Sequence, residues 1–307
     1  MSDEKNAIPL QSKIKRVTIK TLHDMKKKRP EPEIICALSI YDSLHARLFD
    51  RAGGDMIIVG DSVGMTLQGR ANTLPVTMDE MVMFTQAVRR GTDRLFVVGD
   101  MPLGSYEVSN EEAVRNALRF VKEAGCNAVK VETNLDYIDR IRVIASACLV
   151  VAHIGLNPNK AEMLGGYRTQ GKTRESFLEL SKVIVEAEKA GACIILIESV
   201  TEEIAEMLKS KVNIPVFGIA AGRKLDGQLV ISSDLLGFFE WPGNPPIHFE
   251  KYLTERQGIT IGDVTLDAFR WYVKAVKEKR FPSDKHVHHI SADELSQVLQ
   301  TNNNSSA

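Results

Sequence analysis

The chain has 307 residues, 44% of them hydrophobic and 26% charged, which is the composition of a globular protein with a sizeable core. Its 39 basic and 40 acidic side chains give a net charge of −1, which argues against a protein that works mainly by holding nucleic acid or an anionic membrane. No apolar run approaches the roughly 20 residues that span a bilayer, and the first residues lack the apolar core of a secretory signal, so we expect a cytoplasmic protein.

The two ends of the chain are polar. Residues 1–15 and 290–307 show no apolar period, and such composition cannot bury a core. We therefore predict two flexible ends. Residues 16–289 show no break in composition and are predicted to form a single domain.

Eight short runs rich in β-branched residues recur along the chain. Runs of four to eight apolar residues are typical of parallel strands that are buried on both faces. The predicted strands are residues 33–39, 56–61, 95–102, 128–133, 148–155, 192–199, 214–222 and 229–237.

The segments between these strands carry helix signals. Thr77 and Glu80 have the spacing of a capping box, and Asn110 is expected to cap the helix that follows the third strand. Apolar residues at helical spacing over 177–187 predict a further helix, which ends at Gly191.

The alternation of strands and helices defines the fold class. Eight repeats without a break in composition favour one (β/α)8 barrel, a TIM barrel, over two domains. A doubly wound sheet has similar spacing and is the alternative, because spacing alone cannot show that a sheet closes.

Polar side chains occur at the C-terminal ends of five successive predicted strands, the edge at which barrel enzymes keep their active sites. They are Asp61 with Ser62, Asp100, Lys130 with Glu132, His153, and Glu198. Taken alone, Asp61 could cap a turn, Lys130 and Glu132 could form an internal ion pair, and His153 could be a core histidine. Their joint occurrence favours a functional site.

Carboxylates that converge on one mouth repel each other unless a cation offsets their charge. Oxygen ligands without a cysteine or histidine pair indicate Mg²⁺ or Mn²⁺ rather than Zn²⁺. A 2-keto acid can chelate such an ion through its keto and carboxylate oxygens, which stabilises an enolate by several kcal/mol. The sequence therefore predicts enolate chemistry.

The cysteines give a different prediction. Cys36, Cys126, Cys148 and Cys193 form no C-x-x-C pair, and three of them lie within apolar runs. We predict buried free thiols rather than metal ligands or disulfides.

Seven motifs occur in a fixed order. They are VGDSVGMTLQGRANTLPVT (59–77), GDMP (99–102), VKVE (129–132), AHIGLNP (152–158), LGGYRTQG (164–171), LIE (196–198) and DGQLVISSD (226–234). On these motifs the chain resembles the ketopantoate hydroxymethyltransferase family, over about residues 18–289. The resemblance implies a TIM barrel of the phosphoenolpyruvate/pyruvate-binding superfamily, assembled as a homo-oligomer, commonly a decamer.

The resemblance also implies roles for the strand-end residues. The implied metal ligands are Asp61, Asp100 and, through water, Glu132; the implied substrate-binding residues are Asp61, Ser62, Asp100 and Lys130; Glu198 is the implied general base, with His153 near the substrate. The implied reaction uses Mg²⁺ and moves a one-carbon unit from 5,10-methylenetetrahydrofolate onto 3-methyl-2-oxobutanoate. The product is 2-dehydropantoate, for pantothenate synthesis, so the expected partners are a small 2-keto acid and a folate.

The chain departs from the family pattern at several positions. Thr133, Asn134 and Ala220 stand where glycines are usual, Ser233 stands where a histidine is usual, and residues 240–249 are atypical. The alternatives are therefore a paralogue that acts on a different 2-keto acid, a related C–C bond lyase, or a barrel that binds without turnover. The K-x-C-G-H loop of the related lyases is absent from the sequence, and retention of all the strand-end residues argues against loss of turnover.

Overall fold

The structure is a computed structural model that describes residues 15–28, 30, 32–161, 163, 166–238, 258–261, 263, 264, 267 and 274. Contacts divide the chain into two compact units, residues 1–235 with 241–250, and residues 236–240 with 251–307. The barrel described below belongs to the first unit. Apart from Lys15, the predicted flexible ends lie outside the described residues, as do the atypical residues 240–249. The predicted domain boundaries stay predictions.

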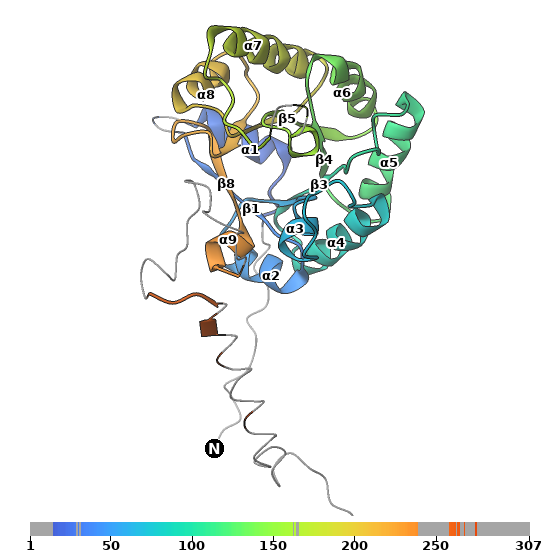
Figure 1. Ribbon diagram of the computed structural model, residues 1–307, viewed down its shortest axis with the longest axis vertical. Coiled ribbons are helices and arrows are strands. Elements are labelled where there is room, and N and C mark those ends of the chain that lie inside the picture. Colours follow the sequence, from blue (N-terminus) through green and yellow to red (C-terminus); the bar gives the residue numbers. More distant parts are fainter. Residues whose placement is uncertain are drawn as a thin grey trace, which may run out of the picture. The chain divides into compact units, whose positions relative to one another are not determined.

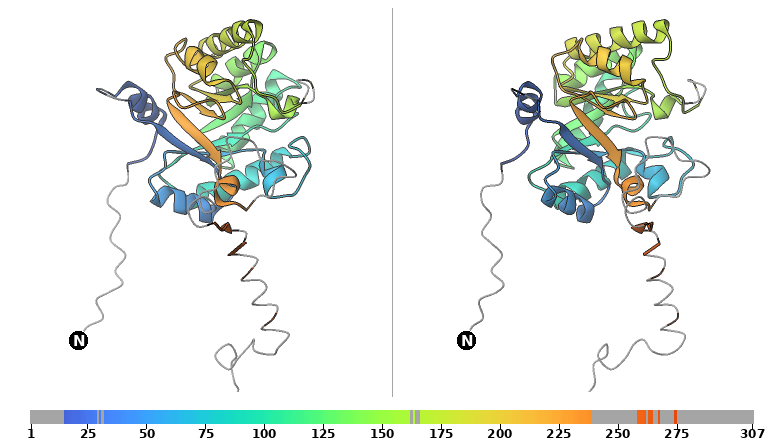
Figure 2. Two further views of the ribbon diagram at one scale, coloured as in Figure 1. Left: turned by 60° about the vertical axis from the view of Figure 1, so that its left-hand side comes forward. Right: turned by 90° about the vertical axis from the view of Figure 1, so that its left-hand side faces the viewer.

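Eight parallel strands pair in chain order and close into a barrel through the pairing of β1 with β8 (Figure 1). The strands are β1 Ile35–Ser39, β2 Met56–Val59, β3 Phe96–Asp100, β4 Ala128–Glu132, β5 Leu149–Gly155, β6 Ile194–Glu198, β7 Val216–Ile219 and β8 Gly227–Ile231. Figure 2 shows β1 and β8 side by side. This closure confirms the predicted TIM barrel and rules out an open, doubly wound sheet.

One helix precedes the first strand, and the others follow the strands, most of them around the outside of the barrel (Figure 1). They are α1 Ile19–Lys27, α2 Ser43–Arg51, α3 Val63–Thr66, α4 Met78–Gly91, α5 Asn110–Lys122, α6 Ile138–Ala145, α7 Arg174–Lys189, α8 Glu202–Lys209 and α9 Ser232–Leu236, with 3-10 turns η1 Leu135–Tyr137 and η2 Pro158–Lys160. The capping box of Thr77 and Glu80 is confirmed at the start of α4. The α5 cap is one residue earlier than predicted, because the Ser109 side chain accepts from the backbone N–H of Glu112.

The core has two layers. One lies between the strands and the surrounding helices and contains, for example, Val97, Phe120 and Ile144. The other fills the barrel interior, where Phe96 and Phe217 pack with Leu22 of α1. α1 thus closes the N-terminal end of the barrel and leaves the C-terminal end for polar residues.

Two sequence predictions are wrong in detail. The predicted eighth strand, 229–237, is shorter, because residues 232–236 form α9 with Asp234 in its first turn, where a carboxylate favours a helix start. All four cysteines are free, but only Cys126 is buried, while Cys148 and Cys193 are partly buried. Cys36 is exposed, because it lies on the outer side of β1 while Ile35 and Ala37 face the interior. None of the described helices is long and apolar enough to cross a membrane.

Candidate active site

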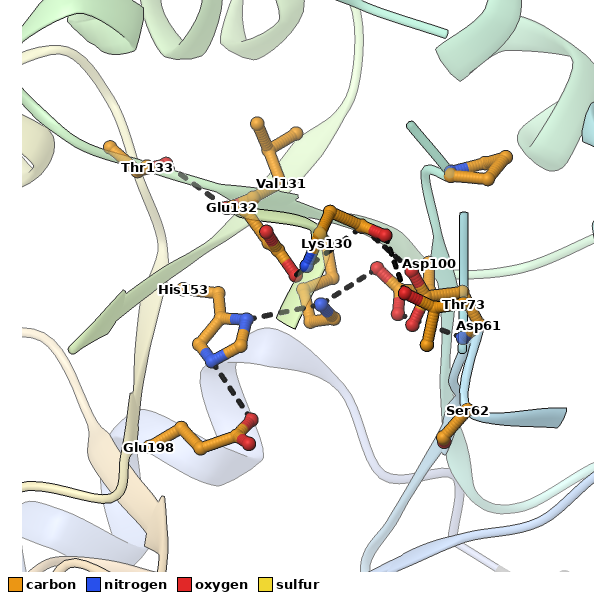
Figure 3. A network of polar contacts seen from close by, with 12 residues as sticks. Asp61, Ser62, Thr73, Asp100, Lys130, Val131, Glu132, Thr133, His153 and Glu198 are labelled. Atoms are coloured by element: carbon orange, nitrogen blue, oxygen red, sulfur yellow. Dashed lines mark hydrogen bonds and ion pairs between the residues drawn. The ribbon is translucent and has the colours of Figure 1, made fainter. Parts of the chain in front are cut away.

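The strand-end residues meet at one end of the barrel (Figure 3). Neighbouring strands pair Asp100 with Lys130, Glu132 with His153, and Gly155 with Glu198. These residues continue the inward-facing rows of the strands, because side chains alternate between the two faces. Gly155 has φ +95°, and a Cβ there would lie 2.4 Å from the Glu198 carbonyl oxygen, so only glycine lets β5 and β6 approach here.

The first group in the site is a buried ion pair. The Lys130 ammonium lies 2.8 Å from Asp100 Oδ1, and Asp100 Oδ2 accepts from the Asp61 backbone N–H at 3.0 Å. Burial would lower the pKa of Lys130, but the carboxylates of Asp100, Glu132 and Asp61 raise it above its usual value. Lys130 is therefore a fixed positive charge that lies among three acidic side chains.

The second group is a chain of contacts from Lys130 through His153 to Glu198 (Figure 3). Lys130 Nζ lies 3.1 Å from His153 Nδ1, and His153 Nε2 lies 3.1 Å from Glu198 Oε2. An ammonium only donates, so Nδ1 accepts and Nε2 carries the proton, which faces Glu198. Burial and the Lys130 charge lower the pKa of His153.

His153 is therefore a neutral imidazole with a defined tautomer. Its N–H lies at contact distance from Glu198 without the alignment of a hydrogen bond. The Glu198 side chain is 23% exposed, whereas His153 is 1% exposed, so Glu198 is the member of the chain of contacts that solvent or a substrate can reach.

The third group connects two carboxylates through an amide. Asn159, in η2 just after β5, donates from Nδ2 to Asp61 Oδ2 at 2.7 Å and to Glu132 Oε1 at 3.3 Å. Burial raises the pKa of Glu132 well above its usual value, and the charges of Asp61 and Asp100 add to this effect, while Lys130 opposes it. Glu132 Oε2 is buried without a hydrogen-bond partner among the described residues.

Hydroxyl groups form one side of the site. Ser62 Oγ and the Tyr41 hydroxyl lie 2.8 Å apart, and the Tyr41 hydroxyl also accepts from Ser39 Oγ at 3.4 Å. Burial raises the pKa of Tyr41, so its hydroxyl stays protonated at neutral pH. These groups can donate hydrogen bonds to an anionic substrate.

The oxygen donors fit a hard divalent cation. In the part of the chain that the structure describes, no three His, Cys, Asp or Glu side chains are grouped to ligate a metal ion. Mg²⁺ takes only one or two carboxylates and completes its shell with water and substrate oxygens. Asp61 and Asp100 are two such carboxylates. Burial raises the pKa of Asp100 to about 7, and the charge of Asp61 adds to this effect while the charge of Lys130 opposes it. A cation would offset the repulsion between the two carboxylates.

Comparison with known proteins decides the family. A family profile described as ketopantoate hydroxymethyltransferase matches residues 16–284. The chain is 40% identical over 284 residues to the 3-methyl-2-oxobutanoate hydroxymethyltransferase of Alkaliphilus metalliredigens, covering 92% of this chain and 98% of the relative. The chain belongs to the ketopantoate hydroxymethyltransferase family. The Geobacillus sp. enzyme of the same name is also 40% identical, over 277 residues that cover 90% of this chain and 96% of the relative.

Solved structures agree on the fold of this hydroxymethyltransferase family member. A 2,3-dimethylmalate lyase of the PEP mutase/isocitrate lyase superfamily has a TM-score of 0.55 at 15% identity and covers 94% of this chain and 92% of that chain. A phosphoenolpyruvate phosphomutase from Streptomyces platensis also has a TM-score of 0.55, at 16% identity, with 94% and 97% covered. At this identity the likeness shows the shared barrel and nothing about the reaction.

Among the departures from the family pattern, Thr133 and Asn134 make local hydrogen bonds. The Thr133 hydroxyl is buried and donates to the Val131 carbonyl, and the Asn134 side chain caps η1. Ala220 has φ +54°, a left-handed backbone that favours the expected glycine. Ser233, in α9, has a buried hydroxyl without a hydrogen-bond partner among the described residues, and nothing in the structure explains the change from histidine.

The structure brings together every strand-end residue that the sequence singled out: Asp61, Ser62, Asp100, Lys130, Glu132, His153 and Glu198. Their individual roles stay predictions. Sequence reasoning missed Asn159, Thr73 and Tyr41. Thr73 lies within the motif 59–77 and Asn159 directly follows the motif 152–158, but an asparagine after a proline has the appearance of an ordinary turn residue.

Proposed function

We propose that this family member forms 2-dehydropantoate by transferring a hydroxymethyl group to 3-methyl-2-oxobutanoate, and that it does so through an enolate. Its family membership supports the reaction. The observation that carries the mechanism is the chain from buried Lys130 through neutral His153 to the partly exposed Glu198, beside the Asp61–Asp100 pair. Such a site has a base facing the opening and positive charge behind it.

Proton removal at C3 is the first step that these residues perform. A Glu198 oxygen takes the C3 proton: the C3–H bond breaks, an O–H bond forms on Glu198, and the electron pair moves into the C2–C3 bond to give the enolate. His153 Nε2 lies 3.1 Å from the same carboxylate, and because the imidazole is neutral, its N–H faces Glu198 without placing a positive charge beside it. The Lys130 ammonium stabilises the negative charge that develops in the site.

Asp61 and Asp100 are the residues that would hold Mg²⁺, with Glu132 acting through water. Bound there, the ion would supply Lewis-acid polarisation of the keto group. Ser62, backed by the buried Tyr41 hydroxyl, would hold the substrate carboxylate by hydrogen bonding.

The second step forms a carbon–carbon bond. Water adds to the methylene of 5,10-methylenetetrahydrofolate, both carbon–nitrogen bonds to that methylene break, the two water protons go to the folate nitrogens, and the carbon is released as formaldehyde. C3 of the enolate then attacks the formaldehyde carbon, and the resulting alkoxide takes the proton that Glu198 holds. The folate leaves as tetrahydrofolate. The folate donor, a cytoplasmic location and assembly as a homo-oligomer such as a decamer are proposals that rest on the family likeness.

A first experiment tests the enolising site without the folate. Exchange of the C3 proton of 3-methyl-2-oxobutanoate with D₂O, followed by NMR, is expected to depend on both enzyme and Mg²⁺. Absence of exchange with folded protein would overturn 3-methyl-2-oxobutanoate as the substrate. A panel of other 2-keto acids then separates a paralogue with a different acceptor from a barrel without turnover.

The Glu198→Gln variant tests the base. Glutamine keeps the size of the side chain but cannot take a proton, so exchange is expected to fall by at least 100-fold. Keto-acid binding, measured by calorimetry, should stay within about threefold, since the substrate oxygens face other residues. Exchange at the wild-type rate would remove Glu198 from the role of base.

A further inference from the structure

Asn159 occupies a central place in the site. Its Nδ2 donates to Asp61 Oδ2 and to Glu132 Oε1, and its backbone N–H also donates to Glu132 Oε1, at 3.3 Å. Its Oδ1 accepts from the Thr73 hydroxyl at 2.6 Å. One buried side chain, 8% exposed, therefore connects the ends of β2, β4 and β5 with the segment between α3 and α4.

The orientation of this amide is fixed by its partners. The two carboxylate oxygens accept hydrogen bonds, so the amide nitrogen must face them and the amide oxygen must face the Thr73 hydroxyl. Thr73 is 2% exposed, so water does not compete for this contact. The Thr73 hydroxyl thus locks the amide in the one orientation that serves both carboxylates.

We propose that Asn159 is a positioning residue for the divalent cation of this site. Its neutral amide donates to one oxygen each of Asp61 and Glu132 and holds these two acidic side chains in fixed places. The other oxygens of these carboxylates are then left for the cation and its water. This inference rests on the proposed function, because it assumes a cation at Asp61 and Asp100.

The physical reason is the cost of losing the amide. Without its donors, Asp61 and Glu132 are two buried carboxylates that repel and can rotate toward other partners. Groups that orient metal ligands from behind typically contribute 10- to 100-fold to metal affinity. Loss of the amide should therefore weaken metal binding, and it should slow turnover only because less metal is bound.

Mn²⁺ binding to the full-length protein is the direct test, with free Mn²⁺ followed by its EPR signal at saturating 3-methyl-2-oxobutanoate. Asn159→Ala is expected to raise the Kd of Mn²⁺ at least tenfold. In steady-state assays its KM for Mg²⁺ should rise by more than kcat falls at saturating Mg²⁺. A fall in kcat alone, with unchanged Mn²⁺ affinity, would overturn the proposal.

Thr73 provides a second pair of variants that keep the asparagine. Thr73→Val has the same shape but no hydroxyl, and is expected to weaken Mn²⁺ binding severalfold, while Thr73→Ser restores it. If Asn159→Ala does not fold, this pair decides the question. Equal Mn²⁺ affinity in Thr73→Val and wild type would then contradict the assigned role.

A matched control is Asn116→Ala. Asn116 is a partly buried asparagine on α5 whose amide donates to the Ser105 carbonyl, so the variant loses a similar bond away from the carboxylates. Its Mn²⁺ affinity should equal that of the wild type. If the wild-type protein binds no Mn²⁺ in the presence of the keto acid, the proposed function fails. If the wild type binds Mn²⁺ and the Asn159 and Thr73 variants bind it equally well, only the role of Asn159 fails.

Discussion

Two residues with left-handed backbone lie beside the base. Ser199, with φ +49°, directly follows Glu198, and Ala220, with φ +54°, directly follows β7. The Ser199 N–H donates to the carbonyl of Ile219, the residue before Ala220, at 3.0 Å. Each costs about 1 kcal/mol for a residue with a Cβ. Strained backbone of this kind often clusters at active sites.

The Ala220→Gly variant should stabilise the protein. Glycine adopts this backbone without the cost that alanine bears, but it loses about 0.5 kcal/mol or more of freedom on folding, so the expected net gain is at most about 0.5 kcal/mol. Urea unfolding measures it. Ala221→Gly is the control, because Ala221 is buried and is not left-handed, and it should destabilise by about 1 kcal/mol. Equal losses in both variants would mean that the methyl packing of Ala220 outweighs its strain.

For single residues, a functional role could be predicted from the sequence more readily for charged side chains than for amides. Asp61 and Glu198 could be predicted because a carboxylate after a buried apolar run must be paired or functional. Asn159 could not, because its partners Thr73 and Asp61 are 86 and 98 residues away in the chain and become neighbours only when the barrel closes. The tautomer of His153 likewise follows from Lys130 and Glu198 together, not from either motif alone.

Among the elements, the segment between α3 and α4 matters most for the site, because it carries Thr73. Its anchor is Glu80 in the first turn of α4, which accepts from Arg70 Nη1 at 3.1 Å, Gln68 Nε2 at 3.0 Å and the Thr77 N–H at 2.8 Å. The Arg70 contact, then the Thr77 N–H, lowers the pKa of Glu80 from its usual 4.5 to about 2. One helix cap thus fastens the loop that orients Asn159.

Glu80→Gln tests this anchor. Glutamine keeps the capping geometry but loses the charge, so we expect a loss of about 1 kcal/mol at neutral pH. Because the folded pKa is depressed, the carboxylate's contribution is complete above pH 4.5 and disappears as the pH falls toward 2. Urea unfolding between pH 7 and 3 should show the difference from wild type shrinking. A difference that is constant with pH would refute the ion pair. The control is Glu111→Gln: Glu111 is an exposed acid in the first turn of α5, and its loss should lower the free energy of unfolding by only a few tenths of a kcal/mol.

Helix and strand positions could be predicted wherever local chemistry decides them. The capping box at Thr77 was predicted correctly, because both partners lie within one turn. The end of β8 was not, since an apolar run that continues through residues 232–236 has the composition of either a strand or a short helix. The cap of α5 was displaced by one residue because Ser109 and Asn110 are both good capping residues.

The two ends of the barrel carry different residues, those of the candidate active site at one end and a stabilising ion-pair cluster at the other. The C-terminal end holds the carboxylates, while the N-terminal end is closed by α1 and tied by Asp226, which is 2% exposed. Asp226 lies 3.1 Å from the Lys26 ammonium of α1 and 2.9 Å from the Lys209 ammonium of α8, and it accepts from the Val216 N–H. Lys26 lies in a run of basic residues, 26–29, and only the closed fold shows that its partner is a buried carboxylate.

Asp226→Ala should therefore unfold more easily yet catalyse as before. Removing one partner of a buried ion pair leaves the other charges uncompensated and typically costs about 3–5 kcal/mol, which urea unfolding measures. Because Asp226 lies at the N-terminal end of the strands, C3 proton exchange per folded molecule should equal that of the wild type. Glu202→Ala breaks the pair with the exposed Arg223 and should cost at most about 1 kcal/mol. A fall in exchange rate with Asp226→Ala, measured where the protein is fully folded, would show that the two ends of the barrel are coupled, since the contacts described for Asp226 lie at the other end of the strands.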